Sequence, residues 1–286
     1  MKKPLILDGA MGTELQNRGV EVPLPLWSAN ANIEHPTIVT DIHKDYIEAG
    51  SNIITTNTFR STSWTYRKAG YGNSKSKVLA KSSVYKAVDC AQKAVVDSVI
   101  IAGSITTVED CYSPKDYPGK AAVQDTYGYA LEWLYDAGID IILFETMGNM
   151  EEITCALEMG GDYDKPLWIS FIMKDSEHIL DNTPISKVFK FIEQYTVDCI
   201  MINCNQIETT INSINNIKSK WYGVWGVYPN LGYSDYENNY LRIIDGTNFI
   251  DAITTIFSHE PDVFGLCCGS RPSHIKELKN LFKKIG

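Results

Sequence analysis

The sequence has no excess of basic residues and no histidine pattern typical of a metal site. Its 286 residues include 35 acidic and 26 basic side chains, which gives a formal net charge of -9. A field of this sign repels a phosphate backbone, so the composition argues against nucleic acid as a partner. His35, His43, His178 and His259 lie at none of the intervals that metal-binding histidines use.

The chain also lacks a long apolar run. No stretch approaches the roughly 18 consecutive apolar residues that a membrane-spanning helix requires. The N-terminus reaches Asp8 after only a few apolar residues, so it lacks the apolar core of a signal peptide. We therefore expect a cytoplasmic protein with no membrane partner.

Cysteine is present in an odd number, and no secretion signal accompanies it. Seven cysteines of this kind, two of them adjacent, favour reduced thiols and metal binding over a disulfide framework. A hydrophobic share of 44% and a charged share of 21% are typical of a globular chain that folds by itself. No low-complexity linker or shift in composition divides the sequence, so we predict one domain over residues 1–286.

Short apolar or β-branched runs alternate with segments of helical periodicity along the whole chain. The strand-like runs are 5–7, 52–56, 99–103, 140–144, 167–172, 199–202, 222–227 and 263–266. The helix-like segments are 37–49, 75–96, 121–137, 150–158, 184–195, 209–218, 249–259 and 272–284. Eight such units predict an α/β fold, a single (β/α)8 barrel whose strands are buried on both faces. A doubly wound open sheet shows the same alternation and is the rival interpretation.

Polar and thiol side chains follow seven of the eight predicted strands. They are Asp8-Gly9, Thr56-Asn57-Thr58, Ser104, Glu145-Thr146, Asn203-Cys204-Asn205, Tyr228-Pro229-Asn230 and Cys267-Cys268-Gly269. The carboxyl ends of barrel strands meet at one mouth, where the active sites of such folds lie. This pattern predicts one site at that mouth.

Three cysteines fall at the ends of two predicted strands. Cys204 follows the sixth, and Cys267 and Cys268 follow the eighth, so a closed ring brings them near each other. A buried cysteine is often only a small apolar residue, and an adjacent pair matches none of the common Cys-x-x-Cys zinc spacings. Their convergence nevertheless favours a zinc site with three thiolate ligands and a fourth place open.

Five motifs together resemble the homocysteine S-methyltransferase family over nearly the whole chain. This family includes betaine-dependent enzymes and the homocysteine domain of cobalamin-dependent methionine synthase. The motifs are 7–15 (LDGAMGTEL), 49–59 (AGSNIITTNTF), 144–147 (FETM), 202–204 (INC) and 267–275 (CCGSRPSHI). The resemblance implies a (β/α)8 barrel in which Cys204, Cys267 and Cys268 hold Zn²⁺. It also implies that the thiolate of a small-molecule acceptor, homocysteine, fills the fourth place and attacks the methyl group of a donor, giving methionine.

The resemblance further assigns residues to the two substrates. Glu145 matches the glutamate that pairs with the ammonium of homocysteine, and Asp8 and Gly9 match the motif beside its amino-acid end. Trp27 resembles a tryptophan that contacts the donor in betaine enzymes, and Tyr228 is a further aromatic candidate for a cationic donor. The remaining residues expected to contact the substrates are Thr56, Ser104, Asn203 and Asn230.

The methyl donor is left open by the segment that follows Ser104. The family usually continues there with a Gly-Pro and a glycine-rich loop, whereas this chain reads ITTVED at 105–110. S-methylmethionine, S-adenosylmethionine, betaine, dimethylsulfoniopropionate and methyltetrahydrofolate all stay as candidate donors. A zinc hydrolase is the weaker alternative, because three thiolates make zinc a poor activator of water. Two further alternatives are methyl transfer to another small thiol or selenol on the same barrel and a non-catalytic module that only binds zinc or a thiol.

Overall fold

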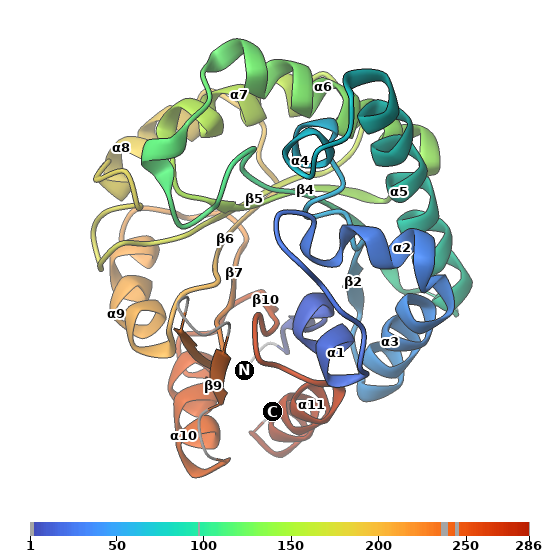
Figure 1. Cartoon of the computed structure of the whole chain (residues 1–286). Helices are drawn as coiled ribbons and strands as arrows, with labels where there is room; N and C mark the ends of the chain where they lie inside the picture. Colours follow the sequence, from blue (N-terminus) through green and yellow to red (C-terminus); the bar gives the residue numbers. More distant parts are fainter. Residues whose placement is uncertain (1–2, 97, 236–239, 244–245, 286) are drawn as a thin grey trace.

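Eight parallel strands form a ring that is surrounded by helices (Figure 1). The computed structural model describes residues 3–96, 98–235, 240–243 and 246–285. The strands are β1 (Leu5–Ile6), β2 (Ile53–Thr55), β3 (Ile100–Ile105), β4 (Ile141–Met147), β5 (Leu167–Phe171), β6 (Cys199–Asn203), β7 (Trp225–Tyr228) and β10 (Val263–Phe264). Their order is β1-β10-β7-β6-β5-β4-β3-β2.

The ring closes between β1 and β2. The Asn52 N–H donates to the Ile6 carbonyl at 2.7 Å, and the Asp8 N–H donates to the Ile53 carbonyl at 3.0 Å. These bonds join the two ends of the strand order, so the sheet is a barrel and the doubly wound alternative is excluded.

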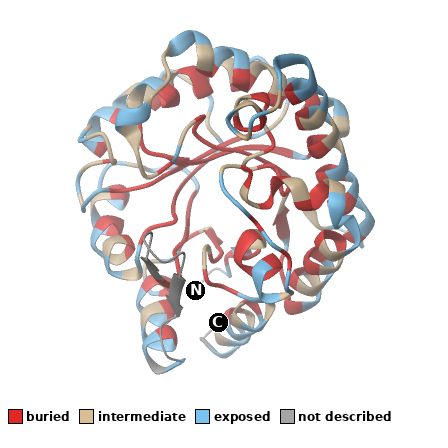
Figure 2. Ribbon diagram, in the orientation of Figure 1, coloured by how far each residue is buried: buried red, intermediate tan, exposed pale blue. Residues whose placement is uncertain are grey.

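Strand β4 shows how the sequence directs side chains to the two faces of the barrel. Ile141 and Leu143 belong to the cluster inside the ring, whereas Ile142 and Phe144 belong to the larger cluster between strands and helices. Because successive side chains of a strand alternate, Glu145 follows Ile141 and Leu143 on the inner face. Figure 2 shows this double burial as continuous red along the strands.

Eight helices pack outside the ring after their strands. They are α3 (Pro36–Ala49), α5 (Asn73–Ala94), α6 (Lys120–Ala137), α7 (Met150–Gly160), α8 (Ile185–Ile192), α9 (Ile207–Lys218), α10 (Gly246–Phe257) and α11 (Pro272–Ile285). Each predicted helix is found, with ends that differ by a few residues. Local signals explain some ends: Pro36 opens α3, and Gly138 ends α6 in the left-handed region at φ 87°. None of the described helices has the length and apolarity that crossing a bilayer requires.

The elements that the periodicity did not predict lie in the loops at the mouth. They are α1 (Met11–Asn17), α2 (Ala31–Glu34), α4 (Ser63–Lys68), two 3₁₀ turns at Trp27–Asn30 and Pro114–Asp116, and the hairpin β8 (Gly232–Asp235) and β9 (Tyr240–Ile243). The predicted run at 222–227 was wrong at its start. Tyr222 is 92% exposed, and the strand begins only at Trp225, where side chains become buried.

Candidate active site and metal centre

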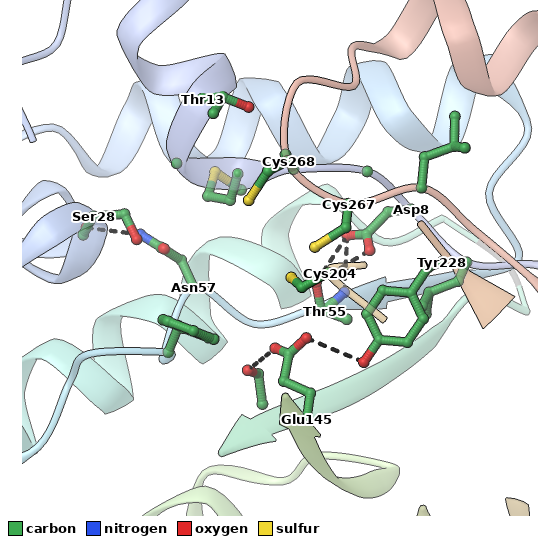
Figure 3. A pocket seen from close by; sticks show the side chains of 18 of the residues that line it. Asp8, Thr13, Ser28, Thr55, Asn57, Glu145, Cys204, Tyr228, Cys267 and Cys268 are labelled. Carbon is green, nitrogen blue, oxygen red and sulfur yellow. Dashed lines mark hydrogen bonds between the residues drawn. The ribbon is translucent and has the colours of Figure 1, made fainter. Parts of the chain in front are cut away.

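The strand ends enclose a cavity of about 110 Å³ at the mouth of the barrel (Figure 3). Ten of the predicted site residues line it: Asp8, Gly9, Trp27, Thr56, Ser104, Glu145, Cys204, Tyr228, Cys267 and Cys268. Nine of them lie at or just beyond the ends of β1, β2, β3, β4, β6, β7 and β10, and Trp27 lies in a 3₁₀ turn of the connection between β1 and α3. The predicted convergence at one mouth is therefore present in the structure.

The sulfur atoms of Cys204, Cys267 and Cys268 all lie within 4.8 Å of one another. Three thiolates at about 2.3 Å from a tetrahedral zinc ion lie roughly 3.8 Å apart, so little movement would be needed to hold one. All three cysteines are free thiols. Two backbone turns bring them together, because Cys204 and Gly269 adopt left-handed conformations at φ 53° and 83°. The residues present thus fit a metal ion.

Hydrogen bonds inside the cluster favour a first thiolate at Cys268. The thiols of Cys204 and Cys267 donate to its sulfur, which lowers the pKa of Cys268 well below its ordinary value. Hydrogen bonds of Cys204 with Cys267 and with Cys268, together with burial, raise the pKa of Cys204 well above its ordinary value. A bound cation would remove that opposition and allow the thiols to ionise together.

Two carboxyl groups lie in the same cavity. Asp8 accepts hydrogen bonds from the N–H and hydroxyl of Thr55 at 2.9 and 3.1 Å, and Glu145 accepts one from the Tyr228 hydroxyl at 3.2 Å and another from Ser104. Burial raises the pKa of Asp8 well above its ordinary value, and it raises the pKa of Glu145 to about 7. In the described part of the chain neither carboxyl group has a lysine, arginine or histidine partner within ion-pair distance. A cavity of this kind favours a cationic ligand.

Trp27 forms one wall of the cavity and depends on a glycine for its place. A Cβ atom on Gly12 would lie 2.2 Å from Nε1 of the Trp27 indole, so only glycine permits this contact. Trp27 itself has a positive φ of 49°. Ser28, the residue after Trp27, is held in place by a hydrogen bond that the Asn57 amide donates to its carbonyl at 3.0 Å. The sequence did not single out Asn57 for its contact with Ser28, which depends on the loop that lies over β2. It did not single out Thr55 for its contact with Asp8 either, because that contact depends on β2 lying beside β1.

Asn203 and Asn230 lie behind the cavity and do not line it. Oδ1 of Asn203 accepts from the Thr146 N–H at 3.0 Å and from the Ser170 hydroxyl at 2.7 Å, while its Nδ2 has no partner in the described residues. Asn230 contacts the backbone of the cysteine segments. For both residues, substrate contact stays a prediction.

The sequence comparison decides the family. Residues 5–282 match the family model described as homocysteine S-methyltransferase. This chain belongs to the homocysteine S-methyltransferase family. A homocysteine S-methyltransferase of Escherichia coli is 31% identical over 96% of this chain and 94% of its own length, and homocysteine S-methyltransferase 2 of Zea mays is 26% identical over 98% and 90%.

One solved structure of a relative is a metal-bound form. The metallated form of the homocysteine methyltransferase MmuM from Escherichia coli matches with a TM-score of 0.85 and 28% identity, covering 98% of this chain and 96% of that one. In this chain the three converging sulfurs are a group that could hold a metal ion.

Proposed function

We propose that this protein is a zinc-dependent methyltransferase that moves a methyl group from a sulfonium or quaternary-ammonium donor to the thiol of homocysteine, giving methionine. One observation carries the proposal: three cysteine sulfurs within 4.8 Å of one another share a cavity with two buried carboxyl groups. This arrangement offers a thiol-binding metal and partners for an ammonium within one cavity. Homocysteine carries both groups on one short chain.

Zinc is the metal that this donor set favours. Three thiolates select soft or borderline cations, and a zinc site with three protein ligands leaves a fourth place open. Zinc held there supplies a position at which the acceptor thiol is bound as a thiolate at neutral pH, although a free thiol has a pKa near ~8.5. Cys204, Cys267 and Cys268 are the residues that would hold it.

Asp8 and Glu145 would hold the ammonium of homocysteine. Burial opposes their ionisation, and a substrate cation compensates it through charge-assisted hydrogen bonds. Ser104 and Tyr228 donate to the two oxygens of Glu145, which fixes the plane of the carboxylate. Homocysteine would thereby be held in one orientation, with its thiol toward the cysteines and its ammonium at these carboxylates. Such positioning supplies a large part of the rate acceleration of a bimolecular transfer.

The transfer itself is a displacement at the methyl carbon. A bond forms between the homocysteine sulfur and that carbon, and the bond from carbon to the positive sulfur or nitrogen breaks. The leaving sulfide or amine takes the electron pair and becomes neutral, and the thiol proton has already left to solvent. Trp27 and Tyr228 line this cavity. An aromatic face attracts a cationic donor by about 0.5 to 2 kcal/mol per contact.

The compartment belongs to the same proposal. All seven cysteines are free thiols, which fits the reducing cytoplasm. Neither substrate requires a membrane or a nucleic acid.

An assay of the zinc-loaded protein tests the proposal. Homocysteine would be combined in turn with S-methylmethionine, S-adenosylmethionine, betaine, dimethylsulfoniopropionate and methyltetrahydrofolate, and methionine would be measured. We expect methionine with at least one sulfonium or ammonium donor, and none after Cys204→Ser. Cysteine and selenocysteine as alternative acceptors decide whether homocysteine is preferred. No methionine with any donor would reject the proposed reaction.

A further inference from the structure

The three cysteines lie on two segments that are far apart in the chain, and a third segment fills the space between them. Residues 228–231 are the last residue of β7 and the three that follow it, and β7 lies between β6 and β10 in the ring. The Cys204 N–H donates to the Tyr228 carbonyl at 3.3 Å, and the Cys267 N–H donates to the Pro229 carbonyl at 2.8 Å. Both cysteine segments therefore hydrogen-bond to this one connection.

The side chain of Asn230 joins the same two segments directly. Its Nδ2 donates to the Cys204 carbonyl at 2.8 Å, and its Oδ1 accepts from the Cys268 N–H at 3.1 Å. The residue is 4% exposed, so water competes little for either bond. An asparagine amide has a donor and an acceptor on one rigid plane, and it can satisfy a carbonyl on one side and an N–H on the other.

Tyr112 adds a second contact from the opposite side of the mouth. Its hydroxyl donates to the Cys204 carbonyl at 3.2 Å and accepts from Nδ2 of Asn230 at 3.4 Å. The loop around it is fixed on both sides, because Glu152 accepts from the Val108 N–H and Asn149 donates to the Pro114 carbonyl. The Cys204 carbonyl thus accepts hydrogen bonds from two buried or part-buried side chains.

These contacts act where the backbone needs support. Cys204 adopts a left-handed conformation at φ 53°, which is strained for a residue with a Cβ atom. In the described residues no covalent bond joins the sulfur of Cys204 to Cys267 or Cys268, because all three cysteines are free thiols. Fixing the Cys204 carbonyl fixes the peptide plane that follows it and, through φ and ψ, the direction of its side chain.

We propose that Asn230 and Tyr112 are positioning residues that hold the two cysteine segments at metal-binding separation before the ion arrives. The two side chains act through the Cys204 carbonyl and the Cys268 N–H, so the sulfurs need little rearrangement when metal binds. This inference rests on the proposed metal site, and it adds residues from β7 and from the loop after β3 to the set that governs it.

Metal release from the holoprotein tests this inference without any assay of turnover. Zinc-loaded wild type, Asn230→Ala and Tyr112→Phe would be mixed with a chromophoric chelator, and the rate of zinc transfer followed. Neither substitution changes a charge, so electrostatic attraction for the ion is unaltered. We expect release about tenfold faster in Asn230→Ala, as is typical when a residue that orients a metal ligand is lost, and a smaller increase of about twofold to fivefold in Tyr112→Phe.

Two control variants match the chemistry of these changes away from the cysteines. Asn32→Ala removes a fully buried asparagine whose amide donates to the Asn57 carbonyl and the Ser83 hydroxyl, and Tyr66→Phe removes the hydroxyl that donates to Asn30. Both should release zinc at the wild-type rate. Circular dichroism and urea unfolding of the metal-free proteins would show that each variant folds, and Tyr112→Phe, which loses a single oxygen, keeps the test available if Asn230→Ala does not.

Cadmium supplies a second measurement. The ultraviolet absorption of cadmium bound to thiolates counts sulfur–metal bonds, and we expect weaker cadmium binding in the same two variants. Release and cadmium affinity equal to wild type in both would overturn the positioning role, even if the wild type transfers methyl groups. Faster release in a protein that transfers no methyl group would reject the proposed reaction and keep this inference. A wild type that binds neither ion would reject both.

Discussion

Asp8 and Glu145 show at the scale of single residues why this cavity favours a cationic ligand. Glu145 lies inside the ring because it continues the inward face of β4, and Asp8 follows β1 and is held by Thr55. Burial raises the pKa of both carboxyl groups, with the pKa of Glu145 reaching about 7. An ammonium between them restores the ionised forms, since an opposite charge nearby lowers a carboxyl pKa.

Glu145→Gln should weaken homocysteine binding while leaving metal binding intact. Glutamine keeps the shape and loses the charge, so a charge-assisted hydrogen bond of about 1.5 to 3 kcal/mol becomes a weaker neutral one. We expect roughly a tenfold or larger increase in Kd by calorimetry with zinc-loaded protein. 4-Mercaptobutanoate, which lacks the ammonium, is the matched ligand and should bind both proteins equally. Equal homocysteine affinity in the two proteins would remove Glu145 from this role.

The sequence predicted those site residues that follow from strand order alone. Five of these residues stand at or near strand ends: Asp8, Glu145, Cys204, Cys267 and Cys268. Closure of the ring brings these strand ends to one mouth. Their partners were not predictable in the same way. Thr55 reaches Asp8 only because β2 lies beside β1, and Tyr112 reaches Cys204 only because of how the loop after β3 crosses the mouth.

At the scale of elements, helix α3 contains a buried histidine with an expected effect on stability. His43 is fully buried, and both ring nitrogens lack a hydrogen-bond partner in the described part of the chain. Burial alone lowers its pKa to about 4. An unfolded histidine has a pKa near ~6.5, so the unfolded chain binds the proton more tightly than the folded one.

The contribution of His43 to the free energy of unfolding should therefore fall as the pH falls from about 6.5 toward 4. A folded pKa below the unfolded value favours folding only while the ring is neutral, and the loss reaches about 2 kcal/mol at pH 5. Urea unfolding at pH 7.5 and pH 5 would measure it. His43→Gln cannot take up the proton and should lose less stability between these pH values, whereas the exposed His35→Gln should behave as wild type. Equal losses in His43→Gln and wild type would contradict this origin.

Element prediction succeeded where a pattern is long and failed where it is short. The eight outer helices carry a repeated apolar stripe, and the strands are apolar on both faces, so each left a clear signal. Helices α1, α2 and α4 span four to seven residues, too few for a periodicity to develop. They form because loops at the mouth pack on the barrel, which is tertiary information.

At the scale of the whole molecule, closure of the barrel creates the site. β6, β7 and β10 are neighbours in the ring, and the residues that follow them bring together Cys204, Asn230 and the pair at 267 and 268. In an open sheet the same residues would not be required to meet β1 and β2, which add Asp8 and Thr55. The relation to the metallated relative at a TM-score of 0.85 agrees with this arrangement of the whole chain.

The account as a whole depends on one ion held by three sulfurs, and the metal content of the purified protein tests that claim most directly. After dialysis against dilute zinc and then against metal-free buffer, the wild type should retain about one zinc per chain, as measured by elemental mass spectrometry. Cys204→Ala should retain almost none, whereas Cys155→Ala, which changes a buried cysteine on α7, should retain the full amount. A Cys204→Ala protein that holds as much zinc as the wild type would contradict the account.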